Sequence, residues 1–194
     1  MEPALKEAKK GDAVVYFGDS AHFVMGAFLA ILWSFTRIFI KTSSGRKRFN
    51  VLGALNAVTL QMITVVNDSY INAWSVAELL KKLRELHPNE KITLILDNAG
   101  YQTCYVVKSA AHMLDIKLLY LPPYSPNLNL IERAWKFIRK KSLNCKYYES
   151  FDAFKLAIMD CIEKFSGEHR AELETLLTWT FQTFPSSQTG EKAA

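Results

Sequence analysis

The sequence predicts one α/β domain, built as a mixed sheet with helices on both faces. Two apolar, strand-like segments at 49–58 and 61–66 are joined by a short connection, which favours antiparallel pairing. From residue 72 onward strand and helix patterns alternate, which is typical of strands joined by helices packed on a sheet. The 194 residues, 49% of them hydrophobic, suit a single domain with a sizeable core.

The elements follow one another without an internal repeat or an interdomain linker. An extension at 1–12 precedes the first strand, and the main domain is expected over 13–184. Strands are predicted at 13–17, 27–33, 49–58, 61–66, 92–96 and 117–121. Helices are predicted from Asn72 to near His87-Pro88, then at 104–114, 129–143, 151–165 and 168–180. The segment 185–194 has the composition of a disordered tail.

Charge is unevenly distributed, although the net charge is only +5. No acidic residue occurs between Ser20 and Asn67 or between Arg133 and Tyr148, and basic residues gather in both stretches. Such stretches suggest a polyanion partner, and a solvated surface is the alternative. The candidate contacts are Arg46, Lys47, Arg48, Arg133, Lys136, Arg139 and Lys140.

Cysteine usage and hydropathy predict a protein of a reducing compartment. Cys104, Cys145 and Cys161 are odd in number and lack metal-ligand spacing, so reduced thiols are expected. The N-terminus has no signal-peptide pattern. The apolar stretch 23–40 is interrupted by Arg37 and is too short in apolar residues to span a bilayer, which favours a buried core segment and no membrane.

Three acids form the candidate site. Asp19 and Asp97 each follow an apolar strand, and Glu132 lies near the start of a predicted helix, with thirty-four residues (98 to 131) between Asp97 and Glu132. The carboxyl ends of strands in open α/β sheets are where ligands usually bind. Oxygen ligands suit magnesium, and two such ions can drive hydrolysis of a phosphodiester beside a basic surface.

Each acid also has a structural interpretation. Asp97 can belong to a turn, and Asp19 can cap a local element. Glu132 can form a capping box with Asn129 and an ion pair with Lys136. The same helix predicts Ile131, Trp135 and Ile138 on its inner face, with Glu132 sharing its outer face with the cations Lys136, Arg139 and Lys140.

Three segments resemble the catalytic core of mariner-like DDE transposases, and most nearly bacterial transposases of the insertion sequence 630 family. They are 17–23 (FGDSAHF), 95–99 (ILDNA) and 121–132 (LPPYSPNLNLIE). The last segment, with its interval from Asp97, is the most specific. The likeness runs from about 14 to 184.

The resemblance implies a ribonuclease-H-like fold of the retroviral-integrase-like superfamily. It further implies that Asp19, Asp97 and Glu132 are catalytic and bind two Mg²⁺ ions, with Mn²⁺ able to substitute. The family cleaves double-stranded DNA at transposon ends and joins the freed 3′-hydroxyl to TA targets. A homodimer on DNA, in the bacterial cytoplasm and nucleoid, is the corresponding expectation.

The chain departs from the family by lacking the N-terminal helix-turn-helix modules that read element ends. A separate or frameshift-fused helix-turn-helix chain is therefore an expected partner. Three hypotheses follow: a transposase catalytic domain, a truncated non-catalytic DNA-binding remnant, and a structural or membrane-associated protein whose acids are only caps and turns.

Overall fold

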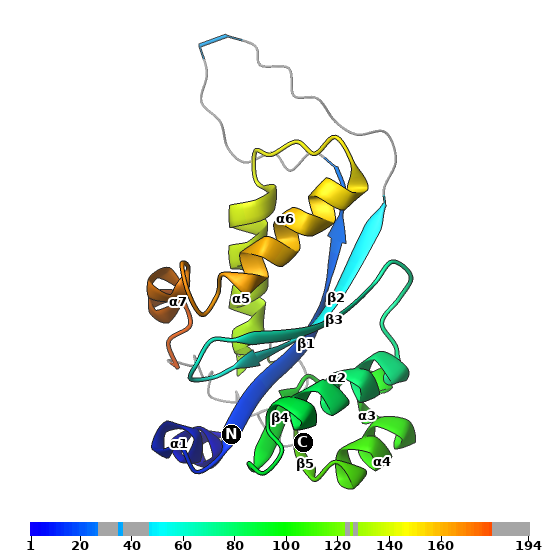
Figure 1. Ribbon diagram of the computed structural model, residues 1–194, viewed down its shortest axis with the longest axis vertical. Coiled ribbons are helices and arrows are strands. Elements are labelled where there is room, and N and C mark those ends of the chain that lie inside the picture. The colour runs from blue at the N-terminus through cyan, green and yellow to red at the C-terminus, as the bar shows by residue number, and fades with distance from the viewer. Residues whose placement is uncertain (27–34, 37–46, 123–124, 126–127, 180–194) are drawn as a thin grey trace, which may run out of the picture.

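A five-stranded mixed sheet organises the protein, as expected from the sequence (Figure 1). The computed structural model describes residues 1–26, 35–36, 47–122, 125 and 128–179. The strand order is β3-β2-β1-β4-β5. The strands are β1 (Val14–Val24), β2 (Arg48–Asn56), β3 (Met62–Asn67), β4 (Ile92–Leu96) and β5 (Ile116–Tyr120).

The first three strands pair antiparallel, whereas β4 and β5 add in parallel beside β1. β1 is twice as long as predicted. The prediction ended at Phe17 because polar residues follow it, but β2 continues to pair with β1 as far as Val24 opposite Arg48. The pairing of β1 with β4 ends earlier, at Gly18 opposite Leu96. β1 therefore projects beyond the parallel half of the sheet.

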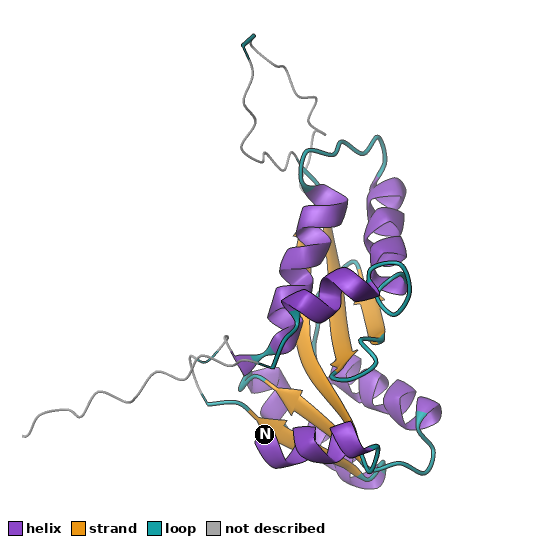
Figure 2. Ribbon diagram, turned by 90° about the vertical axis from the view of Figure 1, so that its left-hand side faces the viewer, coloured by secondary structure: helices purple, strands orange, loops and turns teal. Residues whose placement is uncertain are grey.

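Helices cover both faces of this sheet (Figure 2). Those predicted from the sequence are confirmed, and the structure adds α1, α3 and a π-helical end to α5. The helices are α1 (Glu2–Lys10), α2 (Ala73–Leu86), α3 (Gly100–Thr103), α4 (Tyr105–Met113), α5 (Leu130–Ile138), η2 (Arg139–Leu143), α6 (Phe151–Glu163) and α7 (Arg170–Leu176).

The alternation of side chains along β1 feeds two separate cores. Val15, Phe17 and Phe23 lie in the core under α1, α5, α6 and α7, whereas Tyr16 lies in the core under α2 and α4. β2 is buried on both faces from Phe49 to Asn56, as a central strand requires. Adjacent residues of β1 therefore contribute their side chains to different cores.

The N-terminal extension is a helix that packs on the first of these cores. Leu5 and Ala8 are its buried residues. The helix ends at Gly11, whose φ of 82° is the left-handed conformation that favours glycine at this position. Only short-range amphipathicity in 1–12 could have indicated it.

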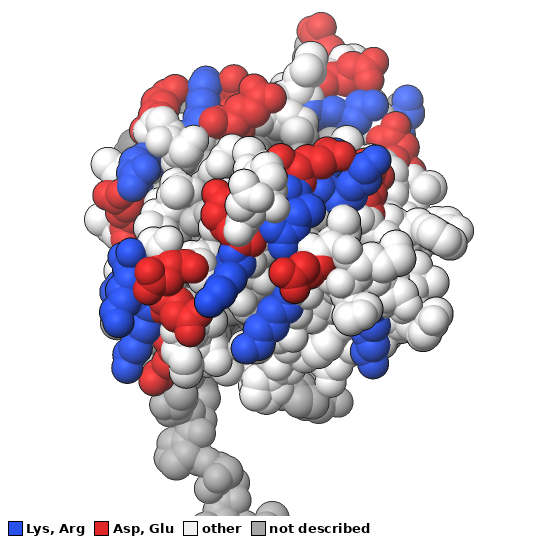
Figure 3. Space-filling view, turned by 60° about the horizontal axis from the view of Figure 1, so that its bottom comes forward, with Lys and Arg blue, Asp and Glu red and all other residues white. Residues whose placement is uncertain are grey.

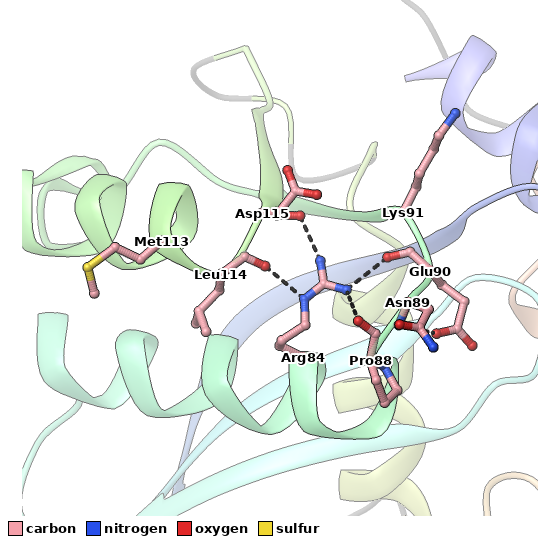
Figure 4. Close-up of a pocket in the computed structure, with 8 residues that line it drawn as sticks. All are labelled: Arg84, Pro88, Asn89, Glu90, Lys91, Met113, Leu114 and Asp115. Carbon is pink, nitrogen blue, oxygen red and sulfur yellow. Dashed lines mark hydrogen bonds between the residues drawn. The ribbon is translucent and has the colours of Figure 1, made fainter.

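Beside the second core, the guanidinium group of Arg84 connects the segments that follow α2 and α4. Arg84 donates to the backbone oxygens of Leu114 (2.8 Å) and Asp115 (2.7 Å), just past the end of α4. In the loop after α2 it also donates to His87 O at 2.7 Å. Figure 4 shows its further bonds to Pro88 O and Glu90 O. Helix ends leave carbonyls without intrahelical partners, so this arginine ties two such ends together. An open pocket of ≈ 320 Å³ adjoins it, but the guanidinium is already committed to carbonyls.

The surface at this lower end of the molecule carries both signs of charge. Figure 3 shows lysines and arginines interspersed with aspartates and glutamates. On α2, for example, Lys82 pairs with Glu78 at 3.4 Å and Lys81 approaches Glu85 at 3.8 Å. This mixture does not form the single-signed surface that a polyanion would select.

Several expectations concern segments outside the described residues: the strand at 27–33, most of the apolar stretch 23–40 and the tail 185–194. Over the parts that are described, no helix has the length and apolarity needed to cross a membrane. The three cysteines are free thiols, as expected.

Replacing Arg84 with Met should lower the free energy of unfolding by about 2 kcal/mol, because charge-assisted hydrogen bonds to helix-end carbonyls are lost. Urea unfolding followed by circular dichroism measures the change. Lys81→Met is the matched control, since the Lys81 side chain is 71% exposed. Equal stabilities of the two variants would show that the arginine does not stabilise the helix ends.

Candidate active site

Asp19 and Asp97 lie side by side where the pairing of β1 with β4 ends. Each is the residue that follows the last β1–β4 pair, Gly18 opposite Leu96. Strand alternation puts both on the side of Phe17 and Ile95, which is the α5 side. The expectation that both acids end their strands is right for Asp97 and wrong for Asp19. Asp19 lies within β1, opposite Gly53, because β1 continues along β2.

Glu132 approaches the same point from α5. It lies in the first turn of the helix, which packs on β1 and β2 through Ile131 and Trp135. Asp19 is only 8% exposed. Burial first, then the charge of Glu132, and also that of Asp97, raise the pKa of Asp19 to about 7. The three acids predicted from the sequence are therefore electrostatic neighbours.

Two donors hold the buried Asp19 carboxylate. The indole Nε1–H of Trp135 donates to Asp19 Oδ2 at 3.0 Å. That bond and a backbone hydrogen bond from Ser20 act against the rise in the pKa of Asp19, but burial and the neighbouring acids outweigh them. No cationic side chain is among the causes that act on this carboxyl. The site thus concentrates negative charge rather than neutralising it within the chain.

Trp135 can reach Asp19 because Gly53 has no side chain. A Cβ at Gly53 would come within 2.7 Å of Trp135 Cη2 and 3.2 Å of Ile131 Cδ1. Since Gly53 is the residue paired with Asp19 on the neighbouring strand, the indole ring lies directly over the β1–β2 ladder. A larger residue at this position would displace α5 from the sheet.

The predicted capping box at the start of α5 is wrong. Asn129 is the N-cap residue, but its side chain makes no capping hydrogen bond. Its Nδ2–H donates instead to Gly18 O at 3.3 Å, because the side chain is buried against β1. Within the described part of the chain, Glu132 and Lys136 also form no ion pair. Neither structural interpretation of Glu132 accounts for its carboxylate.

The acids are close, but they are not preassembled around one point. Among the described residues, no three Asp, Glu, His or Cys side chains form a group that could hold a metal ion. Asp97 is exposed and Glu132 is partly exposed, whereas Asp19 is fixed by its two donors. Asp19 is therefore the rigid member of the set, and the other two are the adjustable ones.

The predicted basic contacts fall into two groups. Arg133 and Arg139 contact the fold. Arg133 donates to Leu176 O at the end of α7 and to Thr178 O (2.9 Å) just after it. Arg139 lies 5.4 Å from the Phe23 ring centroid. The exposed members are Lys47, Arg48, Lys136 and Lys140. Arg46 lies outside the described residues.

A hydroxyl pair beside the acids was not predicted. The Tyr101 hydroxyl lies 3.1 Å from Ser20 Oγ and accepts from Gln102 Nε2 at 3.3 Å. Burial above all, together with Asp97 and Asp19, raises the pKa of Tyr101, so it remains a neutral hydroxyl. On the same strand as Ser20, His22 Nδ1 lies 2.6 Å from Asn50 Oδ1. Only the position of Tyr101 four residues after Asp97 hinted at its place.

Comparison with known proteins places this geometry in a family. The family model described as DDE superfamily endonuclease matches residues 14–155. Among curated proteins, the uncharacterized protein y4pE/y4sA of Sinorhizobium fredii (strain NBRC 101917 / NGR234) is 31% identical over 84 residues. That match covers 43% of this chain and 60% of the relative, so the chain spans less than two thirds of the relative's length.

Solved structures share the fold. The Mos1 mariner paired-end complex with Mn matches with a TM-score of 0.64 at 15% identity, over 95% of this chain and 61% of that one. The Mos1 transposase paired-end complex with left transposon end matches at 0.60 and 14% identity, over 93% and 60%. The HTLV-2 integrase catalytic core domain in complex with magnesium matches at 0.53 and 10% identity, over 79% and 84%. The protein has the fold of these catalytic cores, and by its family match it belongs to the DDE superfamily endonucleases.

Proposed function

We propose that this protein is the catalytic domain of a DDE transposase, of the insertion sequence 630 kind, which cleaves and joins DNA with divalent metal ions. One observation carries the proposal. The buried carboxylate of Asp19 lies beside Asp97, where the pairing of β1 with β4 ends, and close to Glu132 in the first turn of α5. Clustering acids in this way is costly to stability, which is the usual mark of a functional site.

The donor set fits Mg²⁺ or Mn²⁺. Three carboxylates offer the hard oxygen ligands that these ions prefer, and their mutual repulsion, visible in the raised pKa of Asp19, is relieved by a cation. Asp97 and Glu132 have exposed surface and therefore room to turn toward Asp19. We infer two ions, held by Asp19, Asp97 and Glu132. Ions bound there would activate the attacking oxygen and offset charge on the phosphate.

The chain's own residues would then orient DNA at this edge. Lys136 and Lys140 project from the segment that carries Glu132, and Lys47 and Arg48 lie at the start of β2. Cations there would neutralise phosphates on either side of the scissile bond. We assign a smaller share to Arg133 and Arg139, because both already contact the fold.

The proposed partner is double-stranded DNA: transposon ends and a TA target. The Mos1 complex contains a transposon end, and such complexes share this fold. The chain spans about 60% of the length of these relatives. We propose that a helix-turn-helix module, in a separate or frameshift-fused chain, reads the element's ends. We further propose a homodimer on DNA in the bacterial nucleoid.

Asp97→Asn should lower Mg²⁺-dependent nicking of a supercoiled plasmid by more than about 100-fold, since a metal ligand is removed. Conversion to open circles on a gel, in Mg²⁺ and in Mn²⁺, measures the rate. Asp115→Asn is the matched control, because Asp115 precedes β5 at the opposite end of the parallel strands. Equal rates for wild type and Asp97→Asn would favour the non-catalytic remnant.

Asp19→Asn should stabilise the metal-free protein at pH 8. The pKa of Asp19 is raised to about 7, so the folded state loses stability as the pH rises from the ordinary Asp range toward 7. The amide abolishes that loss and retains an oxygen for the Trp135 N–H. The melting temperature of the variant in EDTA should exceed that of wild type at pH 8, by an amount that vanishes near pH 4.

Added Mg²⁺ should reverse this order. Binding to the folded state raises the melting temperature of wild type at pH 8 but has little effect on Asp19→Asn. If the difference in melting temperature between wild type and Asp19→Asn in EDTA is the same at pH 4 and pH 8, the pKa of the Asp19 carboxyl is not raised in the folded state.

Lys136→Gln and Lys140→Gln should each reduce the salt dependence of DNA binding. The slope of log K against log salt should become shallower by about 1 for each phosphate that the protein no longer neutralises. Fluorescence anisotropy of a labelled duplex at several salt concentrations gives the slope. Lys81→Gln, on the mixed-charge surface of α2, should leave it unchanged. An unaltered slope in either α5-side variant removes that lysine from the interface.

A further inference from the structure

Two side chains, one at the N-cap of α5 and one within the helix, donate hydrogen bonds to consecutive residues of β1. Asn129 Nδ2–H donates to Gly18 O at 3.3 Å, and Trp135 Nε1–H donates to Asp19 Oδ2 at 3.0 Å. Glu132 stands three residues from each of them. β1, which carries Asp19, is thus hydrogen-bonded to side chains three residues before and three residues after Glu132.

We propose that Trp135 is a positioning residue of the metal site. Its indole N–H holds Oδ2 of Asp19 and fixes the spacing between Asp19 and the helix that carries Glu132. The inference rests on the proposed function. It adds a fourth side chain, one that does not touch the substrate, to the three acids.

The indole is fixed by its surroundings rather than by the hydrogen bond alone. Trp135 is 1% exposed, and its ring fills the space over Gly53. Phe23 meets it edge-to-face, at 6.1 Å between centroids and 77° between ring planes. A ring locked in this way holds its N–H in one direction, which a flexible donor could not do.

The choice of donor also suits a metal ligand. A lysine or arginine at this place would neutralise Asp19 and compete with the ion. An indole N–H is neutral, and it satisfies one carboxylate oxygen without removing the charge. Metal ligands are commonly oriented by such partners, whose loss weakens metal binding.

Asn129 supports the same arrangement at a cost to its own helix. Gly18 O is an acceptor, so the amide nitrogen must face it, and the helix start is left without a side-chain cap. The other amide atom, Oδ1, is buried and has no hydrogen-bond partner among the described residues. A buried polar atom left unpaired lowers stability, so the contact with β1 is maintained against local stability.

The decisive variant is Trp135→Phe, which keeps an aromatic ring over Gly53 and removes the donor. Ile138→Val is the matched control, since Ile138 is fully buried on the same face of α5 and its aliphatic side chain cannot donate a hydrogen bond to Asp19. Mn²⁺ binding is measured by calorimetry, plasmid nicking is measured across a Mn²⁺ series, and duplex binding is measured by anisotropy.

Trp135→Phe should raise the Mn²⁺ concentration for half-maximal nicking by about 10–100-fold and weaken Mn²⁺ binding in parallel. Its duplex binding should equal that of wild type, and Ile138→Val should match wild type in all three measurements. A purely structural role would change the melting temperature of both variants and leave the metal dependence alone.

The inference is overturned if Trp135→Phe and Ile138→Val show the same metal dependence while wild type nicks DNA. Should Trp135→Phe fail to fold, benzothienylalanine at 135 decides, because it keeps the ring shape and replaces the N–H with sulfur. Failure of the proposed function has a different signature: wild type then shows neither Mn²⁺ binding nor nicking above Asp97→Asn, and the inference falls with it.

Discussion

The structure depends on a carboxylate buried in a core. Asp19 lies between β1 and α5, where an ionised group costs several kcal/mol unless it is paired. Its surroundings supply two N–H donors and two further acids, and none of the causes that shift its pKa among the described residues is a cationic side chain. Three neighbouring features are connected with the burial of Asp19. Helix α5 covers it, Gly53 lets that helix approach the sheet, and a bound cation would balance the charge of the acids.

Helix α5 meets this constraint by combining packing with chemistry on one element. Its inner face buries Ile131, Trp135 and Ile138 against the sheet, and its first turn presents Glu132. The same packing therefore sets both the stability of the core and the spacing of the acids. A loop carrying Glu132 would hold that spacing less well, because loops open at lower free energy than a packed helix.

The sequence predicted most of this arrangement because the relevant signals are local. Periodicity located β4 and the inner face of α5, and Asn72 opens α2 with a side chain that accepts from Trp74 N and Ser75 N. The signals that failed are not local. Whether β1 extends past Phe17 depends on β2, and whether Asn129 caps α5 depends on how near Gly18 lies. Trp135 was predicted to be buried, but its partner Asp19 lies 116 positions away in sequence, beyond the reach of any window.

Charge shows the same limit and narrows the proposed DNA surface. In the sequence Arg133 and Arg139 count equally with Lys136 and Lys140, yet in the structure both arginines contact the fold and both lysines are exposed. An arginine forms fixed, directional contacts with carbonyls and rings, whereas a lysine is a compact charge on a flexible stem. The arginines therefore stabilise the α5–α7 contact and the core near Phe23, and in the proposed DNA complex the lysines that share a face with Glu132 would bind the phosphates.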